Sequence, residues 1–500
     1  MTIATLSSLR SQTLPSFRLA FGILAAVAVV RLIGLHLSVV DLFPDESQYW
    51  AWSRALAFGY SSKPPLLAWV IAAATQVCGN TEACIRAPAP IFYFATSLTV
   101  YAIACQLYDA RVAFFAAVSI GLATGVAFSA RIISTDVPLL LFWALALLAY
   151  VKLLDGGDWR WAGLLGGSLG LGLLTKYAMI YFLPGIVLAA LLDHDARRFL
   201  RSPSLWLAIA IAAVLIAPNI VWNIEHGWVT LRHTGDNIRG AGIEFNPLHA
   251  LEFVGSQFGV FGPVLFALML FGVVRVASPA IDRADRLMLA FALPQLALVT
   301  ADSLVNRANA NWAASAFISG AIAAVALLVR HQAWKWLAAS ITCGVVAQVV
   351  LLAGDTAATR LHLPFPANSD PYQRTLGWRS LGEQAGLLAR RVGARTIVGV
   401  TREEVASLLY YWRDQPEQIL AWPLPQVRQR ELTPDFTDAA PQPILYVSEL
   451  PQTELLSRCF ARIEPLGELD TPTGPTTARS YFVFKLGAPR GPIGPSGSCQ

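Results

Sequence analysis

Long apolar blocks separated by short polar segments fill the first 353 residues of the chain. A helix needs about 20 apolar residues to cross a bilayer. We therefore predict eleven transmembrane helices, at 18–38, 88–107, 112–130, 136–153, 160–176, 178–192, 203–222, 251–274, 286–304, 312–329 and 332–353. The segment Leu66–Cys78 is also apolar, but its 13 residues predict an interfacial or re-entrant helix.

The pattern changes after Gly354, where Pro, Asp, Glu and Arg become frequent and no apolar block is long enough to span. Short runs predict strands at 396–400, 444–447 and 481–485 and a helix at 403–412. We expect a small α/β domain over residues 354–486, a size that can hold its own core. The Gly/Pro/Ser-rich residues 487–500 predict a disordered tail.

Composition and charge agree with a membrane protein. Hydrophobic residues make up 55% of the chain and charged residues only 14%, whereas soluble proteins carry about 25% charged residues. This excludes a soluble globular enzyme, a disordered chain and a coiled coil. The net charge is +5, and no basic run is dense enough to indicate nucleic-acid binding.

Lys and Arg gather in alternate short loops, which predicts a cytoplasmic N-terminus. No small-residue cleavage site precedes Arg31, so the first span is interpreted as a retained signal-anchor. Eleven spans then place the C-terminal domain outside. The expected location is the plasma membrane, the inner membrane of a bacterium.

Cysteine and glycine spacings suggest two local contacts. Cys78 and Cys84 could form a disulfide if their loop is extracytoplasmic, and free thiols are the alternative. The pairs Gly163/Gly167 and Gly166/Gly170 have small-xxx-small spacing, which favours close helix packing. A phosphate-binding loop is disfavoured because the required strand is absent.

The first predicted outside loop carries the most informative residues. Asp45 and Glu46 follow the first span and precede Tyr49, Trp50 and Trp52. An interfacial aromatic belt would explain the aromatics, but it does not explain the two acids. Lys63 stands directly before Pro64-Pro65, which fix the backbone where the lysine side chain leaves it.

Further ionisable residues fall at the same predicted ends of other helices. Placing a charged side chain near the membrane interior costs about 3 kcal/mol of insertion free energy, so such a residue indicates a function. Any one of these residues could instead be a snorkelling residue, whose charged end reaches the membrane surface. The group comprises Arg131, Asp136, Lys176, Glu225, His226, Arg232, Arg239, Asp302 and Arg307. A carboxylate can take a proton from an attacking hydroxyl, and Lys and Arg can stabilise a departing phosphate. The pattern predicts transfer of a sugar from a polyprenyl phosphate to a hydroxyl acceptor.

Several motifs occur together in one order. They are Asp45-Glu46-x-x-Tyr49-x-x-Trp52, Tyr60-x-x-Lys63-Pro64-Pro65-Leu66, Asn80-Thr-Glu82-x-x-x-Arg86, Thr135-Asp136-x-Pro138, Leu174-Thr175-Lys176-Tyr177, Trp222-Asn223-x-x-His226-x-Trp228 and Asn311-Trp312. Over roughly residues 15–350 the chain resembles the GT-C integral-membrane glycosyltransferases of family 39. This family includes protein O-mannosyltransferases and the aminoarabinose transferase that modifies lipid A. The C-terminal domain is similar to those of the family in placement and coarse fold.

The resemblance implies a polyprenyl-phosphate sugar donor, an extracytoplasmic active site and an inverting single displacement. The acceptor would be lipid A, another envelope glycan or a protein. Asp45 would be the catalytic carboxylate and Asp136 a second acidic residue near it, while Tyr60, Lys63 and Lys176 would face the donor phosphate.

The residue chemistry adds further candidates to this set. Glu46 or Asp136 would orient the acceptor or stabilise the oxocarbenium-like charge, and Arg232 or Arg239 would assist the lysines at the phosphate. Aromatic residues would form a wall for sugar and lipid: Tyr49, Trp50, Trp52, Tyr177 and Trp312.

Two positions depart from the aminoarabinose transferase. Ser62 replaces a glutamate that helps to hold a metal, and Gln48 replaces a basic residue. Aminoarabinose is therefore not established as the sugar, and a divalent metal stays an open alternative. Glu225 and His226 could contribute to a cation site, although a role as ordinary loop residues is favoured.

Other functions remain as alternatives. A transporter or flippase of lipid-linked sugars would have many helices, but it would be expected to carry charges near the membrane midplane and internal repeats. A receptor would leave the first-loop acids without a role. An oligosaccharide ligase or polymerase with pyrophosphate-linked donors differs only in the donor head group. The sugar, the acceptor and the polyprenol are not determined by the sequence.

Overall fold

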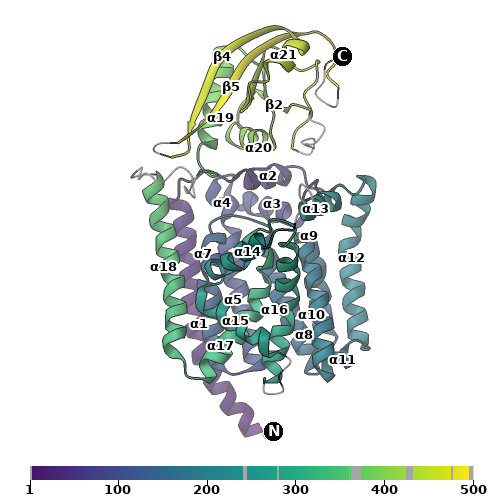
Figure 1. The fold of residues 1–500 in the computed structure, drawn as a ribbon, viewed down its shortest axis with the longest axis vertical. Coiled ribbons are helices and arrows are strands. Elements are labelled where there is room, and N and C mark those ends of the chain that lie inside the picture. The colour runs from purple at the N-terminus through teal and green to yellow at the C-terminus, as the bar shows by residue number, and fades with distance from the viewer. Residues whose placement is uncertain are drawn as a thin grey trace. The chain divides into compact units, whose positions relative to one another are not determined.

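The structure is a computed structural model that describes residues 3–239, 245–276, 278, 281–359, 361, 373–423, 432–474, 477–494 and 499. The chain forms two compact units (Figure 1). The first, here the helical unit, contains residues 1–36, 58–67 and 86–352. The second, here the sheet unit, contains residues 37–57, 68–85 and 353–500.

This division differs from the predicted single domain over residues 1–353. Residues 37–57 and 68–85 belong with the C-terminal residues because they pack against them. The backbone N–H of Leu42 donates to the hydroxyl of Tyr411 at 2.7 Å, and Tyr410 donates its hydroxyl to the backbone oxygen of Asn80 at 2.8 Å. A hydropathy pattern cannot predict contacts between residues that lie this far apart in the sequence.

The helical unit is built from helices throughout its described residues. They are α1 (Ile3–Leu37), α5 (Pro88–Leu107), α6 (Ala110–Leu122), α7 (Thr124–Ser129), α8 (Asp136–Leu154), α9 (Trp159–Thr175), η1 (Tyr177–Tyr181), α10 (Phe182–Leu192), α11 (His194–Phe199), α12 (Pro203–Glu225), α13 (Val229–Arg239), α14 (Pro247–Val260), α15 (Pro263–Arg275), α16 (Arg283–Asp302), η2 (Ala310–Ala313), α17 (Ala316–Arg330) and α18 (Trp334–Thr359). Six stretches of the described chain are long and apolar enough to cross a membrane. They are Ser16–Leu37, Glu82–Leu107, Asp136–Leu154, Pro203–Glu225, Arg283–Asp302 and Trp334–Asp355.

Four predicted spans are interrupted, among them the span at 312–329, which starts as the 3₁₀ helix η2 before α17 begins at Ala316. The span predicted at 251–274 is divided into α14 and α15 at Gly262, whose φ of 93° suits glycine, and Pro263 then begins α15. The span at 112–130 is divided at Ala123, and that at 178–192 starts as the 3₁₀ helix η1. The prediction of continuous helices was wrong at these places because short apolar helices joined by tight turns have the same hydropathy as one long helix.

Gly166 and Gly170 confirm close packing between α9 and α12. A Cβ on Gly166 would lie 2.4 Å from the backbone oxygen of Ala208, and one on Gly170 would lie 2.8 Å from Leu215. Only glycine allows the two backbones to approach this closely. A Cβ on Gly163 or Gly167 would meet no atom within 4 Å, so close packing was wrongly predicted for that pair.

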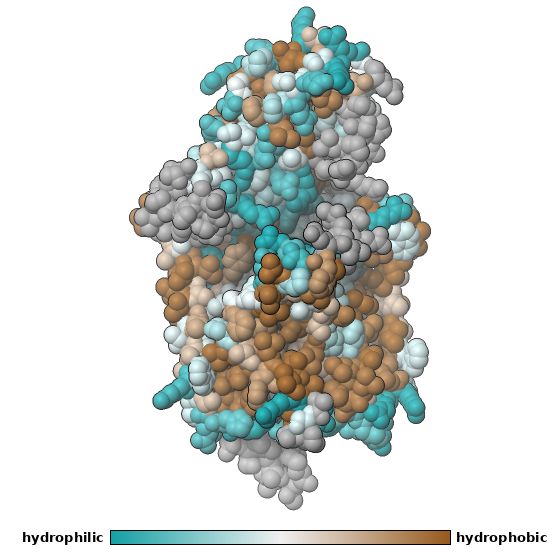
Figure 2. All heavy atoms as spheres, in the orientation of Figure 1, coloured by the Kyte–Doolittle hydropathy of each residue, from teal (hydrophilic) through white to brown (hydrophobic). Residues whose placement is uncertain are grey.

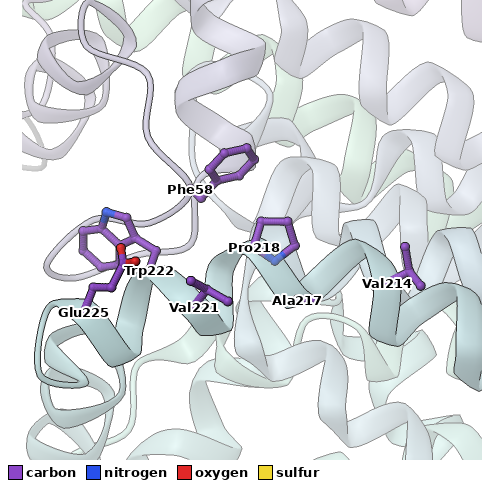
Figure 3. Close-up of a pocket in the computed structure, with 7 residues that line it drawn as sticks. All are labelled: Phe58, Val214, Ala217, Pro218, Val221, Trp222 and Glu225. Atoms are coloured by element: carbon purple, nitrogen blue, oxygen red, sulfur yellow. The ribbon is translucent and has the colours of Figure 1, made fainter.

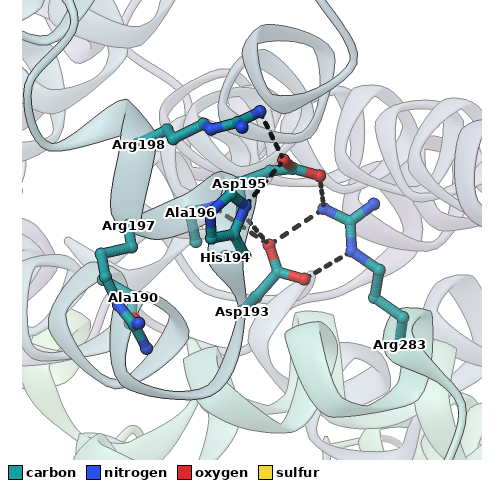
Figure 4. A network of polar contacts seen from close by, with 8 residues as sticks. All are labelled: Ala190, Asp193, His194, Asp195, Ala196, Arg197, Arg198 and Arg283. Carbon is teal, nitrogen blue, oxygen red and sulfur yellow. Dashed lines mark hydrogen bonds and ion pairs between the residues drawn. The ribbon is translucent and has the colours of Figure 1, made fainter.

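One end of the helical unit carries a network of charged side chains (Figure 4). Asp193 caps α11 by accepting from the backbone N–H groups of Asp195 and Ala196 at 3.0 Å. Arg283, at the start of α16, donates to Asp193 at 2.9 Å and to Asp195 at 2.7 Å. The hydrogen bond from Arg283 lowers the pKa of Asp193. The network ties the turn between α10 and α11 to α16.

Apolar side chains face outward from the helical unit. The visible face of its helices is mostly hydrophobic, with hydrophilic residues gathered at its lower end (Figure 2). Val214 and Val221 of α12 and Val349 and Val350 of α18 are exposed. Such a surface is unfavourable in water and suits a lipid environment.

The sheet unit contains a five-stranded sheet in the order β2-β1-β3-β5-β4. The strands are β1 (Thr396–Gly399), β2 (Gln418–Ala421), β3 (Ile444–Ser448), β4 (Phe460–Pro472) and β5 (Ala478–Pro489). β1 is parallel to β2 and β3, whereas β5 is antiparallel to β3 and β4. The three predicted strands are confirmed, and β2 and β4 were not predicted.

Both faces of this sheet are buried. Ile397 and Val398 of β1 point to opposite faces and enter two separate cores. The helices of the unit are α2 (Pro44–Ser53), α3 (Leu66–Cys78), α4 (Glu82–Arg86), α19 (Trp378–Arg391), α20 (Arg402–Tyr411) and α21 (Thr453–Cys459), although α3 and α4 each extend into the helical unit at one end. The predicted short apolar helix at Leu66–Cys78 is α3.

Two disulfides lie in the sheet unit. The bond between Cys78 and Cys84 confirms the predicted pairing, and a second bond joins Cys459 to Cys499. β5 runs to Pro489, into the segment predicted to be disordered. That prediction is wrong for residues 487–489 because the antiparallel ladder with β4 continues through them. It is also wrong for Cys499, which the disulfide holds, while residues 495–498 and 500 lie outside the described part.

Candidate active site

Asp136, Lys176 and Asn311 form a compact cluster in the helical unit, here the Asp136 cluster. Asp136 is the first residue of α8, where the helix dipole favours a negative charge. Its Oδ1 accepts from Lys176 Nζ at 2.7 Å, and its Oδ2 accepts from Asn311 Nδ2 at 2.6 Å. The aspartate side chain is only 8% exposed. Two residues predicted to act at one site thus meet, and Asn311 joins them.

The local backbone explains where Lys176 points. The residue ends α9 in an extended conformation, and its N–H donates to the oxygen of Gly172 at 2.9 Å. The side chain is 20% exposed. An ammonium group has three N–H donors, and Asp136 is the only acceptor that Lys176 has among the described residues. Lys176 can therefore hold Asp136 and still donate to an anion.

The next residue, Tyr177, connects this cluster to α12. Its hydroxyl donates to Asn219 Oδ1 at 2.9 Å and accepts from Asn223 Nδ2 at 3.2 Å. Asn219 in turn donates from Nδ2 to the backbone oxygen of Phe58 at 2.6 Å. This chain of hydrogen bonds holds the segment that leads to Tyr60 and Lys63.

A second hydrogen bond fixes the same segment. Thr230 of α13 donates to the backbone oxygen of Tyr60 at 2.6 Å, and the N–H of Tyr60 donates to the backbone oxygen of Lys63 at 3.2 Å. Tyr60 is buried, whereas Lys63 is half-buried. The ring of Trp222 covers Gly59, leaving no space for a side chain there. Residues 58–63 thus form a turn held by α12 and α13.

An apolar groove runs along α12 beside this turn (Figure 3). Its volume is about 440 Å³. The lining residues are Phe58, Val214, Ala217, Pro218, Val221, Trp222 and Glu225. Glu225 is the single charged residue among them, so the groove suits an apolar chain.

The acidic pair Asp45-Glu46 lies in the sheet unit, at the start of α2. Glu46 accepts from the backbone N–H of Phe43 at 2.9 Å and is buried, so it stabilises the first turn of the helix. Asp45 is 38% exposed. Glu46 therefore has a structural role, and a catalytic role for it stays a prediction.

Asp45 pairs with Arg402, a residue of α20. Arg402 Nη1 lies 2.5 Å from Asp45 Oδ1 and also contacts the side-chain oxygen of Gln48. Burial alone would lower the pKa of Arg402, but the negative charges of Asp45 and Glu403 outweigh this effect and raise its pKa. In the part of the chain that the structure describes, Asp45 Oδ2 has no hydrogen-bond partner.

Comparison with known proteins identifies the family. The sequence model for dolichyl-phosphate-mannose-protein mannosyltransferase matches residues 62–222. The lipid A galacturonosyltransferase RgtD of Rhizobium johnstonii is 36% identical over 393 residues, which are 78% of this chain and 82% of RgtD. The chain belongs to the GT-C family of membrane glycosyltransferases.

Two further comparisons agree with this assignment. The lipopolysaccharide core galacturonosyltransferase RgtA of the same organism is 29% identical over 204 residues, 40% of each protein. The structure of ArnT from Cupriavidus metallidurans, bound to undecaprenyl phosphate, matches the glycosyltransferase with a TM-score of 0.63 and 17% identity over 92% of this chain and 97% of that one. It shows the same fold. The predicted fold class and the predicted multi-pass membrane glycosyltransferase are confirmed.

The remaining predicted site residues of this glycosyltransferase occupy varied positions. The rings of Tyr49 and Trp52 lie 5.7 Å apart in α2, both buried. Trp312 is half-buried in η2, where its backbone oxygen accepts from Gln295 at 2.9 Å. Arg232 is exposed on α13, and the side chain of Arg239 lies outside the described part. The roles of these residues stay predictions.

No described group of three His, Cys, Asp or Glu side chains could hold a metal. Both oxygens of Asp136 are engaged by Lys176 and Asn311, and the ring of His226 stacks on Trp222 with 4.0 Å between centroids. Among the described residues, neither Asp136 nor His226 therefore belongs to a cluster of three such side chains.

Three functional candidates were not predicted in their structural roles: Arg402, Asn219 and Asn311 as a partner of Asp136. Asn311 stands in one of the recognised motifs, so its position carried a signal, whereas Asn219 stands in none of them. Arg402 carried none, because it opens an ordinary helix with a Thr401–Glu404 capping box, 357 positions after Asp45.

Proposed function

We propose that this glycosyltransferase transfers galacturonic acid from a polyprenyl phosphate to a hydroxyl group of lipid A, with inversion at the anomeric carbon. The similarity to RgtD over 82% of that protein carries the proposal. The ArnT-like fold supports a lipid-linked donor, since that structure was obtained with undecaprenyl phosphate. The apolar groove on α12 supports an apolar carrier chain.

The reaction is a single displacement. The acceptor oxygen forms a bond to the anomeric carbon while the bond from that carbon to the phosphate oxygen breaks. The bonding electron pair leaves with the phosphate oxygen, and the products are the glycosylated acceptor and free polyprenyl phosphate. The proton of the acceptor hydroxyl goes to a carboxylate base.

We assign the base to Asp45. Its Oδ1 is paired with Arg402, while its Oδ2 has no partner among the described residues and can accept the proton. Glu46 is engaged in the α2 N-terminus and is the weaker candidate. In this assignment Tyr49 and Trp52 support the sugar from α2.

The phosphate is assigned to Lys63 and Lys176, with Arg232 and Arg239 as additional cations. Lys176 supports this assignment best, because Asp136 fixes its ammonium group while its other donors stay available. Asp136 and Asn311 then act as positioning residues for Lys176. Tyr60, Tyr177 and Trp312 would line the donor site.

Two disulfides support an extracytoplasmic location of the reaction. Cys78–Cys84 and Cys459–Cys499 both lie in the sheet unit, together with Asp45. Disulfides persist in oxidising compartments and are rare in the cytosol. We therefore propose that the sheet unit faces away from the cytoplasm and that the protein resides in the bacterial inner membrane.

Transfer by the purified protein tests the proposal. Wild-type protein is incubated with polyprenyl-phosphate galacturonic acid and lipid A, and mass spectrometry follows galacturonosyl lipid A and free polyprenyl phosphate. We expect Asp45→Asn to lower kcat by about 10²–10⁴, the usual contribution of a general base. Asp414→Asn, which removes a carboxylate that is 82% exposed in the same unit, should retain wild-type turnover.

Two results would contradict the proposal. Wild-type protein that forms neither product has another activity, and transport of an intact donor without chemistry would favour the flippase alternative. Near wild-type turnover of Asp45→Asn would remove only the base assignment. A parallel reaction with lipopolysaccharide core as acceptor separates an RgtD-like from an RgtA-like acceptor.

A further inference from the structure

Arg402 brings a permanent cation from α20 to the proposed base. Its Nη1 donates to Asp45 Oδ1 at 2.5 Å and to Gln48, and its Nη2 donates to Glu403 at 2.8 Å. All four residues belong to the sheet unit. The proposed chemistry uses Asp45 but leaves the function of Arg402 open.

The guanidinium group of Arg402 is not saturated by these contacts. It carries five N–H donors. Among the described residues Nε has no acceptor, and Nη2 donates once. The side chain is 35% exposed, so a substrate can reach it. The Nε and Nη2 edge of a guanidinium has the spacing that binds both oxygens of a carboxylate.

An acidic sugar needs such a cation at this place. Galacturonic acid carries a carboxylate, which would be repelled by Asp45 and by the donor phosphate unless a positive charge lies nearby. The negative neighbours Asp45 and Glu403 raise the pKa of Arg402, which favours its charged form. It can hold Asp45 through Nη1 and a second carboxylate through its other edge.

We propose that Arg402 binds the carboxylate of the donor sugar. The inference rests on the proposed function and adds the residue that recognises the uronic acid. It gives the C-terminal part of the chain a direct role in donor recognition. The donor phosphate is the other anion that Arg402 could bind, and the test separates the two.

The test measures binding of two lipids to the full-length protein. One is polyprenyl-phosphate galacturonic acid, and the other is polyprenyl phosphate without sugar. We expect Arg402→Gln to weaken binding of the sugar-linked lipid by about 10–100-fold, as for lost hydrogen bonds to a charged group, and to leave the sugar-free lipid unchanged. Arg402→Lys should recover only part of the affinity, because lysine keeps the charge but lacks the planar fork.

Arg458→Gln is the matched control. Arg458 lies in the same unit, is 71% exposed and pairs with the exposed Glu454. This variant loses the same charge and should bind both lipids as the wild type does. Circular dichroism and thermal unfolding of all variants identify any general loss of folding.

Three results would overturn the inference. Equal weakening for both lipids would mean that Arg402 binds the phosphate. Unchanged affinities with a lower kcat would mean that it only positions Asp45. If Arg458→Gln also weakens binding of the sugar-linked lipid alone, the effect comes from the change in net charge.

A different result would contradict the proposed function itself. It fails if wild-type protein binds sugar-free polyprenyl phosphate but transfers no galacturonic acid. Normal wild-type transfer together with any of the three results above overturns only the role of Arg402.

Discussion

Substitution of Gly166 by alanine tests the packing that holds α9 against α12. The added Cβ would lie 2.4 Å from the backbone oxygen and 2.9 Å from the Cα of Ala208. Backbone atoms cannot rotate away as a side-chain end can, so the two helices have to separate by roughly 1 Å to restore an ordinary contact. Overpacking of this kind costs about 1–3 kcal/mol.

Gly167→Ala provides the matched control for this substitution. Gly167 lies in the same helix, and a Cβ there would meet nothing within 4 Å. Both variants gain the same helix propensity of alanine over glycine, about 1 kcal/mol. The difference between them therefore isolates the steric cost, and we expect Gly166→Ala to be less stable than Gly167→Ala by about 1–3 kcal/mol.

Reversible unfolding of both variants in detergent measures this difference. Sugar transfer should fall along with stability in Gly166→Ala, because α9 ends immediately before Lys176 and α12 carries Asn219. Equal stability and equal sugar transfer of the two variants would refute the reasoning, since together they would show that α9 and α12 do not touch at Gly166. A stable but inactive Gly166→Ala would show that the helices separate without a measurable cost.

Two further predictions concern the sheet unit. Burial raises the pKa of Glu404 from 4.5 to about 7, so the native state binds the extra proton and stability falls as pH rises from 4.5 to 7, by about 3 kcal/mol at most. Glu404→Gln should lose this dependence in thermal unfolding from pH 4 to pH 8, and an unchanged profile would contradict the assignment. Cys78 and Cys84 should resist a membrane-impermeant maleimide on intact cells until a reductant is added. Labelling that requires permeabilised cells would place their loop on the cytoplasmic side.

Sequence reasoning succeeded where the information is local. The apolar blocks marked most helices correctly because burial in lipid requires a minimum length of apolar chain. Asp136 and Lys176 could be expected at one site because both stand at helix ends, and the structure joins them directly. Cys78 and Cys84 are only six positions apart, so their pairing needed no knowledge of the fold.

It failed where distant segments decide the outcome. Gly166 packs against α12 and Gly167 does not, although both have the same small-residue spacing. The sequence alone could not predict that α20 brings Arg402 to Asp45, nor that Cys499 bonds to Cys459. The sequence also did not predict that the carboxylate of Glu46 accepts a backbone hydrogen bond at the start of α2, and the catalytic role of Glu46 stays a prediction.

The turn at residues 58–63 has a consequence for how the enzyme depends on its lipid surroundings. Asn219 holds the turn to α12. Only 17% of the apolar stretch of this helix is buried inside the protein. Bilayers of different thickness change the tilt of a helix that exposes most of its apolar surface in this way. A change in tilt would move the backbone that presents Lys63, so catalytic rates measured in short-chain and long-chain phospholipids should differ even when every substrate is saturating.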